Sequence, residues 1–175
     1  MSGLIISEIQ DRQWPEVWAM LEPVFCAGET YPFARDISGA EAKEIWVDTP
    51  MRTYVAMQGK TVLGTFYIKP NQPALGAHIC NCGYVVDVAA RGKGVAGSMC
   101  EFSQTEALRL GFLAMQFNLV VETNTGALAL WQRLGFGIVG TVPKAFRHPT
   151  KGLVAAHVMH KDLTLANSGN AGKPV

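Results

Sequence analysis

Apolar and polar positions along the chain follow two periods, which predict an order of strands and helices. Apolar residues that alternate with polar ones, or that run together over a strand's length, predict strands. Strands are expected at residues 4–9, 53–58, 62–68, 77–88, 113–121, 137–142 and 154–160. Apolar residues three or four positions apart predict helices instead. Helices are expected from a cap at Asp11 to about residues 23–28, and at residues 39–48, 94–110 and 127–134.

The order of these elements predicts the fold class. The early strands have short connections, including a hairpin turn at Gly59-Lys60, and a strand–helix–strand unit follows in the middle of the chain. We expect an α/β (α+β) protein with a mixed, twisted, mostly antiparallel sheet of about seven strands, helices on both faces and a central βαβ unit. A chain of 175 residues, 49% of them hydrophobic, is expected to form one domain over residues 1–165, followed by a disordered tail at 166–175.

Composition narrows the classes of function. The net charge of +1 gives no reason to expect a nucleic acid or an anionic membrane surface as a partner. No apolar run reaches the roughly 20 residues of a membrane span, and the N-terminus lacks the pattern of a signal peptide. Four cysteines do not make a dense disulfide framework. We therefore expect a cytoplasmic protein without a membrane or nucleic-acid partner.

Residues 86–97 carry the most specific chemical signal in the chain. A strand leads into a turn that contains Arg91, Gly92, Lys93 and Gly94, and a helix is expected to begin there. Glycines let a ligand approach the backbone closely, and the first N–H groups of a helix are unpaired donors that favour an anion. The two basic side chains add positive charge. The turn is therefore predicted to bind a phosphate or pyrophosphate.

Two motifs fit this turn. Gly92-x-Gly94-x-x-Gly97 satisfies the dinucleotide-binding fingerprint, and Glu122 lies near the expected position of a ribose-binding carboxylate. Against this motif, the strand does not run directly into the first glycine, and the turn follows an antiparallel segment. The remaining chain is also too short for a second mononucleotide-binding half. The alternative motif begins at Arg91.

That alternative, Arg91-x-x-Gly94-x-Ala96, resembles a signature of the GNAT superfamily of N-acetyltransferases. A second segment, residues 122–136, strengthens the resemblance, because Asn124 opens an expected helix that ends in Leu-Gly-Phe. The chain is identified as a member of this superfamily, whose fold has the order of elements expected above. The resemblance implies the GNAT fold and an N-acetyltransferase that uses acetyl-CoA as its acyl donor.

The resemblance also implies which residues contact the coenzyme. Backbone groups freed where two central strands splay apart would pair with the pantetheine amides, and the glycine turn would hold the pyrophosphate. The implied coenzyme-binding residues are Val86, Val88, Arg91, Gly92, Lys93, Gly94, Val95, Ala96, Gly97, Ser98, Asn124 and Trp131. Asn124 equally suits an ordinary helix N-cap. Trp131 stands where many members have a tyrosine that protonates the departing sulfur, which leaves the source of that proton open.

Polar residues in the two splaying strands are candidates for the acceptor site. Asn81 and Asn118 each interrupt an apolar strand, and both are candidate catalytic residues. A buried amide there either binds the acceptor or the thioester, or bonds to neighbouring backbone. Together with residues 117–124, Asn81 resembles a subgroup that includes fungal acetyltransferases of imino acids such as azetidine-2-carboxylate. His78 is a candidate general base, or a histidine at the rim of the sheet. The expected substrate walls include Tyr31, Phe33 and Phe146.

A metal site is considered and not expected. His78, Cys80 and Cys82 have the spacing of residues on one face of a strand. A structural zinc needs four ligands, usually with a turn between paired cysteines. The sequence shows no fourth ligand, so the cysteines are read as small core residues.

The expected function is transfer of the acetyl group of acetyl-CoA to the amine of a small molecule, an amino or imino acid, by direct attack in a ternary complex. A protein, peptide or polyamine acceptor is the alternative within this class. A non-catalytic, CoA-binding regulatory module is the alternative from another class, and Trp131 is the only feature that favours it. A homodimer is also expected.

Overall fold

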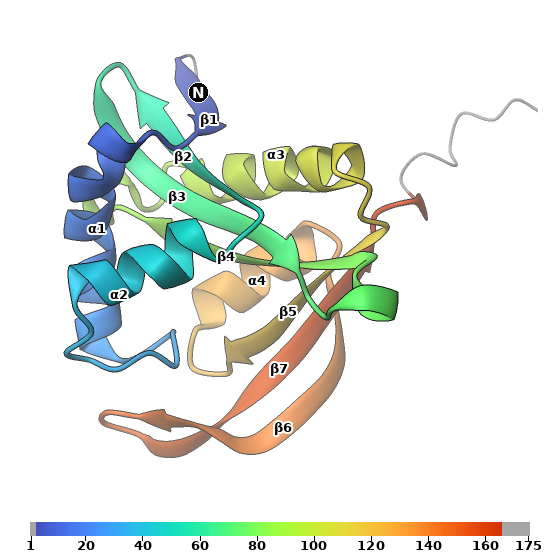
Figure 1. Ribbon diagram of the computed structural model, residues 1–175. Coiled ribbons are helices and arrows are strands. Elements are labelled where there is room, and N and C mark those ends of the chain that lie inside the picture. Colours follow the sequence, from blue (N-terminus) through green and yellow to red (C-terminus); the bar gives the residue numbers. More distant parts are fainter. Residues whose placement is uncertain (1–2, 166–175) are drawn as a thin grey trace, which may run out of the picture.

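The computed structural model describes residues 3–165, and these contain one seven-stranded sheet (Figure 1). In spatial order the strands are β1 (Leu4–Glu8), β2 (Arg52–Gln58), β3 (Thr61–Pro70), β4 (Ile79–Val86), β5 (Ala114–Val121), β7 (Gly152–Asp162) and β6 (Gly137–His148). Every neighbouring pair is antiparallel except β4 and β5, which are parallel. The predicted mixed, mostly antiparallel sheet is confirmed. The expected disordered tail, residues 166–175, lies outside the described residues.

Helices cover both faces of the sheet, as predicted (Figure 1). They are α1 (Trp14–Ala27), α2 (Gly39–Lys43) with a π-helical continuation over Glu44–Asp48, α3 (Val95–Arg109) and α4 (Thr125–Arg133). Side chains alternate along β3, so Phe66 and Ile68 pack with α3 and α4 while Tyr67 packs with α1 and α2. No helix within residues 3–165 combines the length and the apolar character that crossing a bilayer requires.

The first helix begins later than its expected cap. Asp11 opens a short 3-10 turn, and α1 itself starts at Trp14. The capping bond at this turn is made by its neighbours, because the N–H of Gln10 donates to Oε1 of Gln13 at 2.8 Å. Pro15 in the first turn of α1 explains the later start, since proline lacks an N–H and fits the beginning of a helix.

The last two strands are longer than the pattern predicts. β6 continues to His148, because pairing resumes at Phe146 after a register shift that begins at Val142. Pro143 and Lys144, the latter with a φ of 55°, interrupt the alternation within this shift and hide the second half of the strand. A proline is tolerated there because β6 is an edge strand of the sheet.

The parallel pair at the centre of the sheet is short. β4 pairs with β5 only through Ile79 and Cys80, and the two strands then separate. β5 continues along β7 on its other side, with a register shift between Phe117 and Val120. Beyond Cys80, the edge of β4 that faces β5 therefore has no strand partner in residues 3–165. This opening positions the candidate site.

Candidate active site

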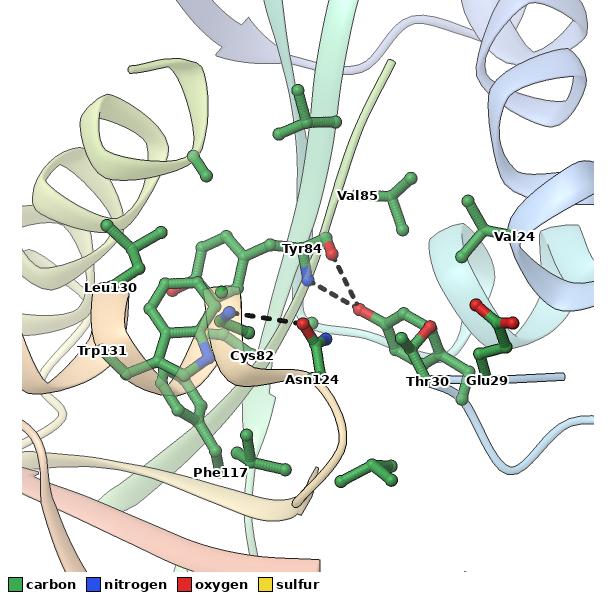
Figure 2. A pocket seen from close by; sticks show the side chains of 18 of the residues that line it. Val24, Glu29, Thr30, Cys82, Tyr84, Val85, Phe117, Asn124, Leu130 and Trp131 are labelled. Carbon is green, nitrogen blue, oxygen red and sulfur yellow. Dashed lines mark hydrogen bonds between the residues drawn. The ribbon is translucent and has the colours of Figure 1, made fainter. Parts of the chain in front are cut away.

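A cleft of about 1120 Å³ opens where β4 and β5 diverge (Figure 2). Its walls come from β4, the loop after α1, the glycine turn before α3, and α4. The N–H of Asp87 bonds to the carbonyl of Leu63 in β3. Because successive backbone groups of a strand point to opposite edges, those of Cys82, Tyr84 and Val86 face the opening. The splayed strands therefore leave these backbone donors and acceptors without a strand partner.

Tyr31 reaches from the loop after α1 to this backbone edge. Its hydroxyl accepts a hydrogen bond from the N–H of Tyr84 at 2.9 Å and donates one to the carbonyl of Tyr84 at 3.0 Å, as the dashed lines at Tyr84 in Figure 2 show. Its ring stacks on Phe33 and meets Phe25 edge-on. Burial raises the pKa of Tyr31 far above its ordinary value, so the hydroxyl stays protonated. Tyr31 and Phe33, both expected as substrate walls, line the cleft.

The glycine turn closes one end of the cleft. Gly94 precedes α3 with a φ of 77°, a left-handed conformation that favours glycine. The first N–H groups of an α-helix have no acceptor within the helix, and no side chain caps those of α3. Of the predicted anion-binding residues, the cleft is lined by Arg91, Gly92, Gly94, Val95, Ala96 and Gly97, but not by Lys93 or Ser98.

The chain bends before it reaches this turn. β4 ends at Val86, two residues before the predicted end at Val88. Oδ1 of Asp87 accepts a hydrogen bond from the N–H of Ala89 at 2.8 Å and opens a 3-10 turn over Val88–Ala90. This local cap competes with continuation of the strand. Both Val86 and Val88 line the cleft, but Val88 does so from the turn.

Asn124 and Trp131 belong to the wall that α4 forms. Oδ1 of Asn124 accepts a hydrogen bond from the N–H of Ala127 at 3.3 Å, so the residue caps α4. Its predicted contact with the coenzyme stays a prediction. The Trp131 ring is buried, with its centroid 5.1 Å from that of Tyr84 and 5.0 Å from that of Phe117. An indole N–H is a donor without useful acidity, so Trp131 supplies shape to the cleft and no proton.

Asn81 is a satisfied, buried amide. It is 8% exposed. Its Nδ2 donates to the carbonyl of Gln116 in β5 at 2.9 Å, and its Oδ1 accepts from the hydroxyl of Tyr67 at 3.3 Å. These bonds join β4 to β5 and β3 where the opening begins. Asn81 also lines the cleft, so the structural role is present and the acceptor role stays a prediction.

The expectation that Asn118 is a second buried amide is wrong. The residue is exposed, because it lies within the register shift of β5 where the strand leaves its regular pairing. Its Nδ2 donates to Oδ1 of Asn71 at 2.6 Å, and its Oδ1 accepts from the side chain of Gln116 at 2.9 Å. Asn118 nevertheless lines the cleft beside Asn81, so its side chain is accessible to a bound molecule.

Two other predicted residues lie outside this lining. His78 is exposed and precedes β4, where its carbonyl accepts the N–H of Leu113, and the described lining of the cleft contains no histidine. Phe146 is buried and lines a second hollow of about 670 Å³ between the loop after α1 and the β6–β7 hairpin. Tyr31 and Phe33 line both spaces. Phe146 therefore shares this second hollow with Tyr31 and Phe33, whereas His78 does not line the cleft that contains Asn81.

Two of the buried cysteines, Cys82 and Cys100, are held as thiols by their surroundings. Burial raises the pKa of Cys82 well above its ordinary value and that of Cys100 to about 11. A thiolate is the reactive form, so Cys82 is poorly suited to carry an acyl group although it lines the cleft. Within residues 3–165, no three or more His, Cys, Asp or Glu side chains lie together as a metal site, and this includes His78, Cys80 and Cys82.

Among the lining residues that the sequence did not predict, three present polar groups to the cleft or to its wall. Tyr84 presents its backbone to Tyr31, and Tyr67 and Lys69 line the cleft from β3. Lys69 lies opposite Asn81 in the β3–β4 register. The sequence shows Lys69 only as a polar residue at the end of an apolar strand, and no local pattern reveals which residue it faces across the sheet.

A mixed sheet that opens at its parallel pair, with an uncapped helix start at one end of the opening, defines an acetyltransferase fold of the GNAT type. The profile of the acetyltransferase (GNAT) family matches residues 6–136, and the chain belongs to this family. The predicted membership of the superfamily is confirmed.

Relatives extend this assignment. N-acetyltransferase aca1 of Schizosaccharomyces pombe is 32% identical over 136 residues, which cover 69% of this chain and 65% of aca1. A GCN5-related N-acetyltransferase from Kribbella flavida is 43% identical with a TM-score of 0.86, over 91% of this chain and 98% of that one. The acetyltransferase-like protein yncA of Salmonella typhimurium, solved with acetyl-CoA, shares the fold at 16% identity and a TM-score of 0.77, over 99% of both chains.

Proposed function

We propose that this protein is an acetyl-CoA-dependent N-acetyltransferase that modifies the amine of a small molecule, an amino or imino acid, by direct attack in a ternary complex. The cleft between β4 and β5 carries the proposal, because it joins a backbone edge that has no strand partner to an uncapped helix start. The family assignment and the named N-acetyltransferase relatives support the activity. The acetyl-CoA bound to yncA supports the choice of acyl donor.

Different residues of the cleft suit the pyrophosphate, the pantetheine arm and the thioester of acetyl-CoA. Acetyl-CoA would supply an activated acyl group as a thioester. Arg91 and the free N–H groups at the start of α3 would bind its pyrophosphate. The backbone of Val86 would pair with the pantetheine arm. The N–H of Tyr84 would donate to the thioester carbonyl and polarise it once the Tyr31 hydroxyl has moved away.

The acceptor must attack as a neutral amine. Asn81 and Asn118 would hold it, since both side chains line the cleft where β4 and β5 begin to diverge. Trp131 has no acidic proton, so water or another hydroxyl group would protonate the departing thiolate. Glu29 is the only carboxylate among the described residues of the lining, which makes a polyamine acceptor the weaker alternative.

A regulatory module that binds CoA without catalysis is the second candidate. Trp131 favours it, because the residue offers no proton to a leaving thiolate. In either case we propose a homodimer, supported by the edge strand β6, which exposes Ile138, Val139 and Val142.

Thiol release from acetyl-CoA tests the function directly. The purified protein would be assayed with amino acids, imino acids, polyamines and short peptides, and the melting temperature would be recorded with and without acetyl-CoA. Turnover with amino or imino acids supports the proposal, whereas turnover only with another class changes the acceptor. Absence of turnover across the panel, with a melting temperature raised by acetyl-CoA, favours the regulatory module.

A further inference from the structure

Lys69 is a cation at the acceptor end of the cleft, far from the glycine turn. It lies on β3 opposite Asn81, whereas Arg91 follows the other end of β4. At about 3.3 Å per residue, the strand from Asn81 to Val86 separates these two ends by about 17 Å. The phosphates of a coenzyme bound as proposed lie at the glycine turn, so they do not account for a positive charge at Lys69.

We propose that Lys69 binds a carboxylate of the acceptor, and that the acceptor is therefore an amino or imino acid whose carboxylate is free. This inference rests on the proposed acetyltransferase function and adds a residue that determines its specificity. It follows from the surroundings of the ammonium group, the donors beside it and the charges of the cleft.

The ammonium group of Lys69 has no carboxylate partner in the part of the chain that the structure describes. Its Nζ lies 5.3 Å from the centroid of the Tyr67 ring, and the residue is half-buried in the wall of the cleft. A ring face attracts a cation more weakly than a carboxylate does, so the ammonium keeps its capacity to bind an anion.

Gly83 sets the position of the ring beneath Lys69. A Cβ atom at Gly83 would lie 2.6 Å from Cε1 of Tyr67, so only glycine lets the ring lie against β4. The hydroxyl of Tyr67 donates to Oδ1 of Asn81 at 3.3 Å and fixes the other end of the ring. Burial raises the pKa of Tyr67, which keeps this hydroxyl neutral and adds no negative charge near Lys69.

Asn118 offers a second donor in the same part of the cleft. Its Nδ2 carries two N–H groups, and one of them donates to Asn71. Asn118 is exposed and lines the cleft, as Lys69 does. A carboxylate has two oxygens, so an ammonium and an amide N–H can each donate to one of them.

The charge at Lys69 also selects among acceptors. A polyamine would bring further positive charges toward an ammonium, and the described lining has only Glu29 to balance them. An amino acid brings its own carboxylate to Lys69 instead. A nearby cation lowers the pKa of the acceptor amine, which increases the fraction of the neutral, attacking form.

Matched acids and amides test the inference. Thiol release would be measured with proline and prolinamide, and with alanine and alaninamide, for the wild type, Lys69→Met, Lys69→Arg and the control Lys60→Met. Lys60 is an exposed lysine in the turn before β3. The wild type should prefer the acids, and Lys69→Met should lower their kcat/KM about 10- to 100-fold. The amide rates, the Kd for acetyl-CoA and the Lys60→Met enzyme should be unchanged, and Lys69→Arg should retain part of the preference.

Equal losses of kcat/KM for acid and amide in a folded Lys69→Met enzyme would overturn the inference. If none of the acceptors makes the wild type release thiol, the proposed function fails. Calorimetry with N-acetylproline and N-acetylprolinamide then tests Lys69 by itself. Weaker binding of only the acid to Lys69→Met supports the carboxylate site. Binding that the substitution leaves unchanged, equal weakening of both ligands, or no binding of the acid to the wild type overturns it.

Discussion

The hydroxyl of Tyr31 accepts a hydrogen bond from the N–H of Tyr84 at 2.9 Å and donates one to its carbonyl at 3.0 Å. Tyr84 lies on the edge of β4 that β5 leaves unpaired, so Tyr31 takes the place of a neighbouring strand. A ligand that pairs with this edge has to displace the hydroxyl. We therefore expect a ligand bound at this edge to move Tyr31 and the loop after α1 that carries it.

Tyr31→Phe should destabilise the free protein and strengthen acetyl-CoA binding. Without the hydroxyl, the N–H and carbonyl of Tyr84 lose their partner, which costs about 1–3 kcal/mol of the free energy of unfolding. Acetyl-CoA no longer displaces a hydrogen bond, so its Kd should fall. Urea unfolding and calorimetric titration measure the two effects.

Tyr54→Phe is the matched control for that change. Its hydroxyl donates to Oε1 of Glu106 on α3, and Tyr54 does not line the cleft. The control should lower stability and leave the Kd for acetyl-CoA unchanged. A Tyr31→Phe protein whose Kd rises or stays the same would show that the hydroxyl does not compete with the ligand.

Gly94→Glu should raise the Kd for acetyl-CoA by about tenfold or more, because a carboxylate would face the pyrophosphate at an unpaired helix start. Gly111→Glu is the control for backbone strain, because it also places a side chain at a positive φ. Gly111 has a φ of 91° and open space around it. Calorimetry should detect weaker binding only for Gly94→Glu. Equal affinities in the two variants would exclude the phosphate site.

Asn118→Ala should lower kcat/KM for the acceptor about 10-fold while changing the free energy of unfolding by less than about 1 kcal/mol, because the side chain is exposed. Asn71→Ala removes the same hydrogen bond from its other end, and Asn71 does not line the cleft. Steady-state kinetics should show the smaller effect for Asn71→Ala. Equal effects would mean that Asn118 acts through this bond alone.

Stability should fall in alkali partly through Cys100. Burial raises the pKa of its thiol from 9.0 to about 11, so the folded protein keeps a proton that the unfolded chain releases above pH 9. This contribution is complete below pH 9 and is lost as the pH rises toward 11, amounting to about 2–3 kcal/mol. Urea unfolding as a function of pH should therefore show a shallower decline for Cys100→Ala. The exposed thiol of Cys26 provides the control, and Cys26→Ala should follow the wild type.

Most strands and helices could be predicted from sequence because their signals are local. The glycine turn and the segment from Asn124 to Phe136 are continuous motifs, so their association with a helix start is readable in the chain. The second half of β6 was not predicted, because Pro143 and Lys144 interrupt its alternation and the pairing that restores the strand comes from β7. Asn118 was misjudged as buried because alternation within β5 does not report its register shift.

The sequence by itself determined the family, the order of elements and the residues of the predicted anion site, since each depends on neighbours along the chain. Tertiary structure alone decided that Tyr31 occupies the backbone of Tyr84 and that Lys69 lies opposite Asn81. These relations join residues from separate elements, and strand register and loop packing set them. For the same physical reason, most residues of the glycine turn that line the cleft were predictable from the sequence, whereas the pairing of Tyr31 with Tyr84 and of Lys69 with Asn81 emerged only from the folded chain.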